Sequence, residues 1–440
     1  MILGATASKW LQTYPRSAAD QLDGNPIQRN IFTALMLMGL IVLAIRRHNV
    51  AAVLRANKIV VLFFLYCALS LIWSDYPDVG LKRWIKACGD LVMVLIIVTD
   101  PQWRAALQRF LARIGFLLIP ISVLLVRYYP YLGRGYKEQD GRQVFEGVTN
   151  DKNMLGVLCL LFGLGALWRF AYERIERHSP GRKGRLLAQG TLLLMSLWLF
   201  SKANSMTSLA CFLIAAVLVV FTSSPSLVRR RRTVHLLVMA VILVAFSALF
   251  LNLGSSLVET MGRDATLTGR TALWKEIVGM NGNPFLGTGF ESFWIGPRLD
   301  LIWGHHWWHP NEAHNGYLEV YLNLGWIGLG ILSAVLVTGY RKVIQMLQRD
   351  PKFGGLFLAF YLVGVIYSFT EAGFRLLNPV WITFLMACTV APDELKPSSS
   401  PQQKLTPRPF SHEADRVFDG EEVENARAAL LPSVRQAQLL

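Results

Sequence analysis

The sequence has few charged residues. Asp, Glu, Lys and Arg make up only 17% of the 440 residues, whereas hydrophobic residues make up 53%, and the mean hydropathy is +0.38. So little polar surface cannot coat a water-soluble globule of this size. We therefore expect an integral membrane protein.

Paired cysteines are lacking as well, and no leader segment is expected. The cysteines are Cys67, Cys88, Cys159, Cys211 and Cys388. None of them forms a CxxC pair and all fall inside apolar stretches, so neither a disulfide framework nor a thiolate metal site is indicated. A cleavable signal peptide is not expected, because the first apolar run begins only at Ile27 and no small-residue cleavage site follows it.

Acidic residues are outnumbered, which gives a formal net charge of +15. A nucleic-acid partner is nevertheless not expected, because Lys and Arg occur in short clusters between apolar runs and leave little polar surface for such a ligand. Clusters of this kind are typical of the cytoplasmic loops that orient a membrane protein.

Long apolar runs dominate the chain. A bilayer core needs roughly 20 apolar residues per helix, and we predict an all-α integral membrane protein with about 11 (10–12) transmembrane helices. They are expected at residues 27–45, 59–73, 84–98, 114–126, 154–172, 186–200, 206–222, 234–253, 315–338, 354–370 and 376–390.

Alternate connections differ in charge. The loops around His48, Asp100, Arg174, Arg229 and Lys342 are far more basic than the others, so by the positive-inside rule they are predicted to be cytoplasmic. The predicted organisation is an N-terminal segment (1–26), a transmembrane bundle (27–253), a periplasmic loop (254–314), further transmembrane helices (315–390) and a cytoplasmic tail (391–440). The tail is rich in Pro and Gln and is expected to be disordered.

The loop 254–314 is long and rich in aromatic residues, including Trp274, Trp303 and Trp308. Long loops usually carry function or are disordered, and this aromatic content favours an ordered cap containing short helices. One helix is predicted over 271–280.

A polar cluster ends this loop. The segment 309–319 reads His-Pro-Asn-Glu-Ala-His-Asn-Gly-Tyr-Leu-Glu and places His314 at the start of the next apolar helix, where Glu319 must face protein or a hydrated cavity. A capping or interfacial histidine is the simpler explanation for an isolated His314. The neighbouring polar residues favour a functional one.

Cations of the loop form a second candidate element. Arg270 lies between Gly269 and Trp274, and a guanidinium is a natural fork for phosphate oxygens. With Lys202 in the short turn 201–208, the loop cations can form a pocket for a diphosphate. Taken singly, three of these cations are explained more simply as side chains that contact solvent or lipid headgroups. These are Arg263, Lys275 and Arg298.

Two further patterns have simpler explanations. Lys152 and Asn153 begin the fifth apolar run, where Thr149 or Asn150 as helix N-cap explains part of the polarity. Zinc is suggested by the spacing of His305, His306, His309 and His314, with Glu312 as a further ligand. The tryptophans among them are typical of a membrane interface, no HExxH motif is present, and we expect neither a metal nor a cofactor.

Residues 268–274 read T-G-R-x-x-x-W and residues 313–319 read A-H-N-x-Y-L-E. This pair of loop motifs resembles the O-antigen ligase and polymerase superfamily, and the segments 151–156 and 201–209 are similar to weaker family patterns. The resemblance spans roughly residues 144–330. It implies an inverting, metal-independent glycosyltransferase of the bacterial inner membrane that acts on the periplasmic face, with an undecaprenyl-diphosphate-linked glycan as donor and a glycan or lipid as acceptor.

By this resemblance, His314 deprotonates or orients the acceptor hydroxyl, a role that suits an ordinary histidine pKa of about 6.5. Arg270 stabilises the departing diphosphate. The remaining residues are expected to bind the diphosphate or the rest of the substrate: Lys202, Arg263, Lys152, Asn153, Trp274, Asn315, Tyr317 and Glu319.

Polymerisation and ligation share this donor. The turn 201–208 and the Asp151-Lys-Asn segment resemble the exopolysaccharide-polymerase branch more closely, and ligases often have an arginine where this chain has Lys202. The resemblance thus favours a polymerase of exopolysaccharide or O-antigen repeat units over a ligase, with chain-length or export proteins as candidate partners. A flippase of lipid-linked sugars is the competing class. Lys86 and Asp90 are its best support, although they are more simply an i, i+4 pair inside the bundle.

Overall fold

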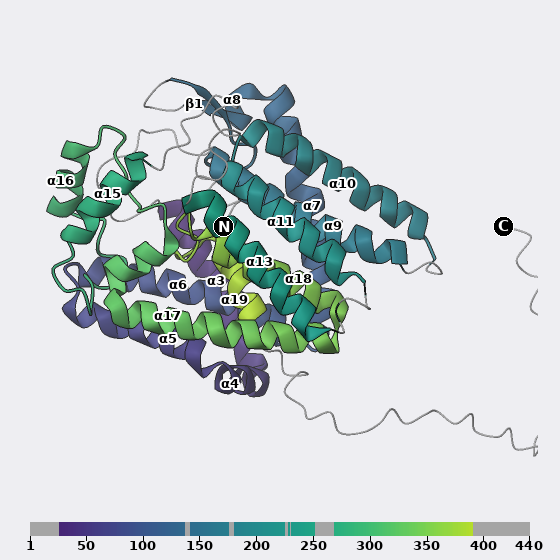
Figure 1. The fold of residues 1–440 in the computed structure, drawn as a ribbon, viewed down its shortest axis with the longest axis horizontal. Helices are drawn as coiled ribbons and strands as arrows, with labels where there is room; N and C mark the ends of the chain where they lie inside the picture. The colour runs from purple at the N-terminus through teal and green to yellow at the C-terminus, as the bar shows by residue number, and fades with distance from the viewer. Residues whose placement is uncertain are drawn as a thin grey trace, which may run out of the picture. The chain divides into compact units, whose positions relative to one another are not determined.

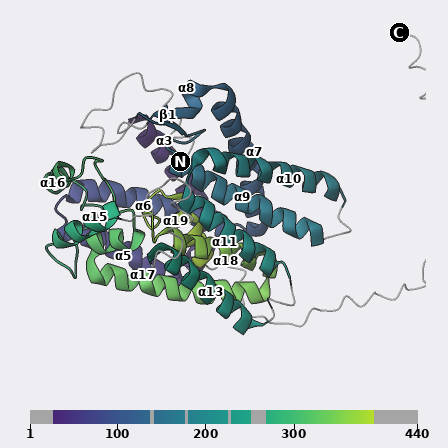
Figure 2. The same ribbon diagram turned by 45° about the horizontal axis from the view of Figure 1, so that its top comes forward.

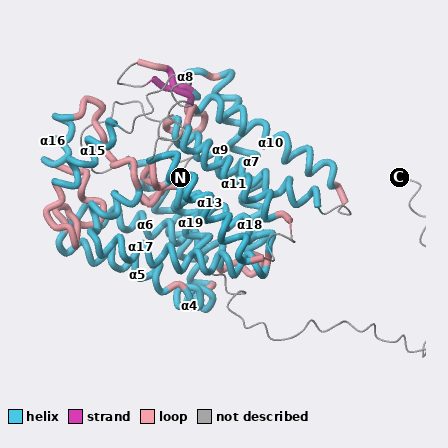
Figure 3. Tube along the Cα trace, viewed as in Figure 1, coloured by secondary structure: helices cyan, strands magenta, loops and turns pink. Residues whose placement is uncertain are grey.

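The computed structural model describes residues 26–136, 141–175, 180–224, 228, 230–250 and 268–389. The predicted N-terminal segment, except for Pro26, and the predicted cytoplasmic tail therefore lie outside the described residues. Figure 3 shows that most of the described chain is helical, with loops gathered mainly beside α15 and α16.

A helix overlaps every predicted apolar run. In chain order these helices are α3 (Pro26–Ile45), α5 (Lys58–Leu69) with the 3-10 turn η1 (Ser70–Trp73), α6 (Pro77–Val98), α7 (Trp103–Tyr128), α9 (Lys152–Ile175), α10 (Arg182–Ala203), α11 (Met206–Thr222), α13 (Arg231–Phe250), α17 (Gly316–Arg349), α18 (Pro351–Tyr367) and α19 (Pro379–Cys388). The predicted runs 84–98 and 114–126 are shorter than the helices that contain them, α6 and α7, because both helices begin with polar turns.

Shorter elements complete the described chain. They are α4 (Arg47–Ala56), α8 (Pro130–Gly133), α15 (Thr268–Gly279), α16 (Pro297–His305) and the antiparallel strands β1 (Arg134–Tyr136) and β2 (Gln143–Phe145). The predicted loop helix is α15, which begins three residues earlier than expected.

Four described helices are long and apolar enough to cross a membrane, namely α7, α9, α10 and α17. A fifth span is possible if α3 and α4, bent by 94° at their junction, count as one. Helices such as α11, α18 and α19 are apolar but shorter than the roughly 20 residues that a bilayer core requires. The helical membrane fold agrees with the prediction, while the count of eleven spans stays a prediction.

Helices α9 and α18 form the interior of the bundle. Helix α9 packs against α7, α10 and α11, and α18 packs against α11, α17 and α19 (Figure 1). Gly156 brings the start of α9 against the turn between α10 and α11, because a Cβ there would lie only 2.6 Å from the Cβ of Ser205. The segments 151–156 and 201–209 are therefore neighbours.

Ion pairs join connections that are distant in the sequence at two ends of the bundle. At the basic end, Arg104 pairs with Asp350 at 2.9 Å. At the other end, Asp75 pairs at 2.8 Å with Arg298 of the long loop. Which end faces the periplasm stays a prediction.

The described part of the long loop lies over that second end. Figures 1 and 2 both show α15 and α16 side by side at one edge of the bundle. Leu273 and Ile277 of α15 share a small apolar core with Phe293, Ile302 and Leu322, so the cap is anchored on the first turns of α17.

Helix α17 is broken at Gly325, which has a φ of 64°. A Cβ at this position would lie 2.1 Å from the carbonyl oxygen of Phe285, so the loop can approach only because the residue is glycine. The single helix predicted over 315–338 is thus two segments, and the first of them carries the polar cluster.

Candidate functional site

The two loop motifs are joined by a hydrogen bond. The indole Nε1 of Trp274 donates to the carbonyl oxygen of Ala313 at 2.7 Å. This bond connects α15, which carries Arg270, to the segment that carries His314. The side chains of Arg270 and His314 then converge on a carboxylate from a distant loop, Glu371.

Glu371 lies in the connection between α18 and α19 and binds both residues. Its Oε1 lies 3.5 Å from Nη2 of Arg270, and its Oε2 lies 3.2 Å from Nδ1 of His314. The Arg270 side chain is 30% exposed, that of His314 22% and that of Glu371 12%. The cluster is therefore sheltered yet reachable from one side.

The backbone around His314 is tightly held. His314 itself has a φ of 50°, a left-handed conformation that costs a non-glycine residue roughly 1–2 kcal/mol. Asn315 caps α17 by accepting from the N–H groups of Tyr317 and Leu318, each at 3.0 Å. Strain of this kind persists where the surrounding structure fixes it, typically at functional sites.

Glu319 is buried and braces the same segment. Its carboxylate accepts from the backbone N–H of Ala313 and from the indole Nε1 of Trp294. The hydroxyl of Tyr317 donates to the carbonyl oxygen of Val365 at 3.0 Å, and Nδ2 of Asn315 donates to that of Phe369 at 3.3 Å. These contacts hold the segment that carries His314. A direct role of Asn315, Tyr317 and Glu319 in substrate binding stays a prediction.

Two carboxylates face the imidazole of His314. Its Nδ1 lies 2.9 Å from Oε1 of Glu312 as well as 3.2 Å from Glu371. Burial alone would lower the pKa of His314, but its hydrogen bonds to these carboxylates and their charges raise the pKa to about 9. The expectation of an ordinary pKa near 6.5 is therefore wrong, because sequence reasoning placed no anion beside the ring.

The pKa of Glu312 shifts in the opposite direction to that of His314. Burial favours the neutral form of Glu312, yet the hydrogen bond and charge of His314, together with Arg375, lower its pKa to about 2. Trp308 stacks on the imidazole with ring centroids 5.9 Å apart and an interplanar angle of 28°. Nδ1 thus faces the carboxylates, and Nε2 is the ring nitrogen left for a substrate.

Arg270 is held from a second direction. Its Nη1 donates to the carbonyl oxygen of Thr370, and the hydroxyl of Thr370 lies 3.2 Å from that of Thr207 at the start of α11. The turn 201–209 therefore reaches the site through Thr207. Lys202, by contrast, is exposed at the end of α10, with its ammonium 5.7 Å from the ring centroid of Trp198, and no contact joins it to Arg270 within the described ranges.

The start of α9 lies near the same carboxylates. Asp151 accepts from the backbone N–H groups of Asn153 and Met154 at 2.8 and 2.9 Å, so Asp151, rather than Thr149 or Asn150, caps this helix. Burial raises the pKa of Asp151 against these bonds, and the charges of Glu312 and Glu371 raise it further.

The remaining predicted cations are dispersed. Lys152 is the first residue of α9, and Arg263 lies outside the described residues. Lys275 is exposed on α15. Arg298 pairs with Asp75 and covers the ring of Phe293, so it contacts other protein groups away from His314.

The zinc pattern does not assemble. His305 and His306 both bind Glu276 of α15, at 2.7 and 2.8 Å, and His309 packs against Trp303. Within the described residues, one group of three side chains has donor atoms close enough for a cation: Glu312, His314 and Glu371. Guanidinium groups already neutralise its carboxylates, since Arg270 pairs with Glu371 and Arg375 with Glu312.

Several charged residues of the site were missed from the sequence. Four of them were not among the predicted site residues: Glu371, Arg375, Glu291 and Arg83. Nη1 of Arg375 lies 3.3 Å from Glu312, and its Nε lies 3.5 Å from Glu291. The sequence contains one indication of a site there, because the charged residues Glu371 and Arg375 lie in a short segment between two strongly apolar helices.

The proposed pairing of Lys86 with Asp90 is wrong. Oδ2 of the buried Asp90 accepts from the backbone N–H of Leu377 at 2.8 Å, and its Oδ1 has no partner. This carboxylate ties α6 to the loop before α19, so it gives no support to an internal ion path.

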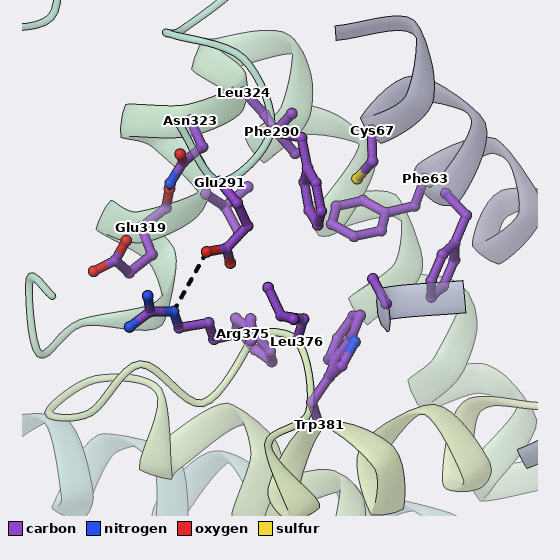
Figure 4. Close-up of a pocket in the computed structure, with 14 residues that line it drawn as sticks. Phe63, Cys67, Phe290, Glu291, Glu319, Asn323, Leu324, Arg375, Leu376 and Trp381 are labelled. Carbon is purple, nitrogen blue, oxygen red and sulfur yellow. Dashed lines mark hydrogen bonds and ion pairs between the residues drawn. The ribbon is translucent and has the colours of Figure 1, made fainter. Parts of the chain in front are cut away.

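A cavity of about 30 Å³ lies behind the site, enough for about two water molecules. Figure 4 shows Arg375 and Glu291 paired on one side of it, with Phe63 and Trp381 on the other. The cavity separates the charged cluster from the apolar bundle and is too small for a lipid or a sugar.

Comparison with known proteins agrees with this arrangement. The model of a family described as O-antigen ligase matches residues 181–333, which include both loop motifs. The chain is also 26% identical over 302 residues to the exopolysaccharide production protein ExoQ of Rhizobium meliloti (strain 1021), an alignment that covers 66% of each protein. The chain thus spans just under two-thirds of that relative. These matches support the O-antigen ligase and polymerase superfamily and confirm the resemblance.

Proposed function

We propose that this member of the O-antigen ligase and polymerase superfamily is an inverting, metal-independent glycosyltransferase. Its donor would be an undecaprenyl-diphosphate-linked glycan and its product a longer exopolysaccharide or O-antigen chain. The observation that carries the proposal is the convergence of Arg270 and His314 on Glu371. It brings a guanidinium and an imidazole together at one end of the helical bundle.

His314 acts as the base. A hydroxyl of the acceptor attacks the anomeric carbon of the donor, and its proton passes to Nε2 of a neutral imidazole whose Nδ1–H faces Glu312 and Glu371. Carboxylates behind a histidine fix its tautomer and increase its basicity. Because the pKa of His314 is about 9, the neutral imidazole becomes more abundant as the pH rises toward that value.

Arg270 receives the leaving group. The bond between the anomeric carbon and the phosphate oxygen breaks as the new bond forms, so the anomeric configuration inverts and the electron pair stays on the diphosphate. A guanidinium can stabilise this charge without a general acid or a metal. In the absence of donor it is held ready by Glu371 and by the carbonyl oxygen of Thr370.

Polymerisation is favoured over ligation by the similarity to ExoQ, an exopolysaccharide production protein. Ligation to lipid A core or another acceptor is the second candidate, because the matching family model is described as O-antigen ligase. Both use the same donor chemistry. We place the site on the periplasmic face of the inner membrane, in keeping with the basic loops at the opposite end of the bundle.

The test replaces the two central residues in cells. We expect His314→Ala and Arg270→Ala each to abolish long-chain glycan while lipid-linked repeat units accumulate on the periplasmic face. His309→Ala is the matched control, because that ring lies against Trp303, and it should leave glycan length unchanged. Repeat units retained on the cytoplasmic face would instead make the protein a transporter.

A further inference from the structure

Arg375 links two carboxylates that come from different parts of the chain. Its Nη1 lies 3.3 Å from Oε2 of Glu312, and its Nε lies 3.5 Å from Oε2 of Glu291. The side chain is 27% exposed. Burial alone would lower the pKa of this guanidinium, but the surrounding carboxylates, Glu291 first among them, raise it above the ordinary value.

Glu312 transmits this contact to His314. One carboxylate oxygen, Oε2, faces Arg375, and the other, Oε1, lies 2.9 Å from Nδ1 of the imidazole. That distance is shorter than the 3.2 Å from Glu371 to the same nitrogen. A guanidinium that fixes one oxygen of a carboxylate also fixes the direction in which the other accepts.

The support behind Arg375 is rigid. Glu291 has a φ of 56°, and Arg83 of α6 donates to its carbonyl oxygen and lies 4.0 Å from its carboxylate. The two following backbone N–H groups, of Ser292 and Phe293, both donate to Oδ1 of Asn323. The loop that presents Glu291 is therefore clamped between α6 and α17.

We propose that Arg375 is a positioning residue that orients His314 through Glu312, an inference that rests on the proposed function. The charged side chains form one continuous series from α6 to the cap: Arg83, Glu291, Arg375, Glu312, His314, Glu371 and Arg270. Arg270 occupies the end of this series and has one carboxylate partner. Arg375 lies inside it and has two, which leaves it less free to turn toward a phosphate.

The experiment measures kcat and the donor KM of the purified protein in lipid nanodiscs, with a defined lipid-linked repeat unit as donor. Charge-assisted hydrogen bonds of this kind are worth about 10-fold to 100-fold in rate. Arg375→Gln should lower kcat by that factor and leave the donor KM unchanged, and Arg375→Lys should restore part of the rate.

Two further readouts separate positioning from a general structural role. If Arg375 acts through Glu312, the double variant Glu312→Gln/Arg375→Gln loses no more rate than the worse single variant, whereas independent effects would multiply. The acid limb of kcat/KM should move to higher pH in Arg375→Gln and to lower pH in Glu312→Gln. The charged groups around the imidazole are Glu312 from its own loop, Glu371 and Arg375 from the loop before α19, Arg270 from α15 and Asp151 from the start of α9.

Arg104→Gln is the matched control, because it breaks an ion pair between the start of α7 and Asp350, at the other end of the bundle, and should not change kcat. A raised donor KM with unchanged kcat in Arg375→Gln, or multiplicative losses in the double variant, would overturn the inference in favour of direct diphosphate binding. If Arg375→Gln fails to fold, Arg375→Lys in the Glu312→Gln background supplies the same comparison. An inactive wild-type protein would refute the proposed function itself, and this inference with it.

Discussion

Replacing Glu371 by glutamine should shift the pH dependence of transfer. The substitution removes the charge that lies 3.2 Å from Nδ1 of His314 and preserves the size of the side chain. In the proposed mechanism the acceptor proton passes to a neutral imidazole, so kcat/KM should rise with pH and level off above the pKa of His314. The wild-type profile should therefore rise up to about pH 9.

The magnitude follows from the environment of the imidazole. A pKa raised from 6.5 to about 9 corresponds to roughly 3 kcal/mol in favour of the imidazolium. Glu312, at 2.9 Å, and Glu371, at 3.2 Å, supply this together against the effect of burial. Loss of one of the two charges should lower the midpoint of the rise by about one pH unit, which is about 1.4 kcal/mol.

The assay is kcat/KM against pH, because this ratio reports the protonation of the free enzyme. Glu276→Gln is the matched control, since Glu276 also binds histidines, His305 and His306, but lies outside the charged series. Its profile should coincide with that of the wild type. If Glu371→Gln leaves the midpoint unchanged, or if the wild-type rate falls as the pH approaches 9, His314 does not act as the base.

Three further outcomes are expected. Removal of divalent ions with EDTA should not reduce transfer, because Arg270 and Arg375 already neutralise the carboxylates beside His314, and an activity that returned only with added zinc would contradict this. Trp274→Phe should lower kcat about 5-fold through loss of one hydrogen bond worth about 1 kcal/mol, whereas an unchanged rate would show that the bond to the backbone does not align the two motifs. Asn315→Ala removes an N-cap and should lower the free energy of unfolding by about 1 kcal/mol, which thermal unfolding in detergent can measure, and an unaltered melting temperature would count against the capping role.

The helices could be predicted because apolar runs of this length have few alternatives. Residues 152–175 and 182–203 form helices close to the ranges read from hydrophobicity alone, and even the loop helix α15 was expected. Their ends were less predictable, because polar turns continue α6 and α7 beyond the apolar runs. The break at Gly325 depends on the approach of Phe285, a contact between segments 40 residues apart in the chain.

The site was predictable only in part. Arg270 and His314 belong to local motifs that the sequence displays directly. Glu371 and Arg375 belong to no such motif, and they reach the site because the turn between α18 and α19 folds back over the start of α17, as the bond from the Gly316 N–H to the Ser368 carbonyl shows. The pKa of His314 follows from these neighbours, so it could not be derived from residue type.

The most direct measurement follows the anomeric carbon during a single transfer. Purified protein is supplied with a lipid-linked repeat unit labelled with ¹³C at that carbon, and NMR records the new glycosidic bond. We expect inversion of configuration with release of undecaprenyl diphosphate by the wild type, and neither product from His314→Ala or Arg270→Ala. Retention of configuration, or transfer by either variant at the wild-type rate, would contradict a single displacement assisted by these two side chains.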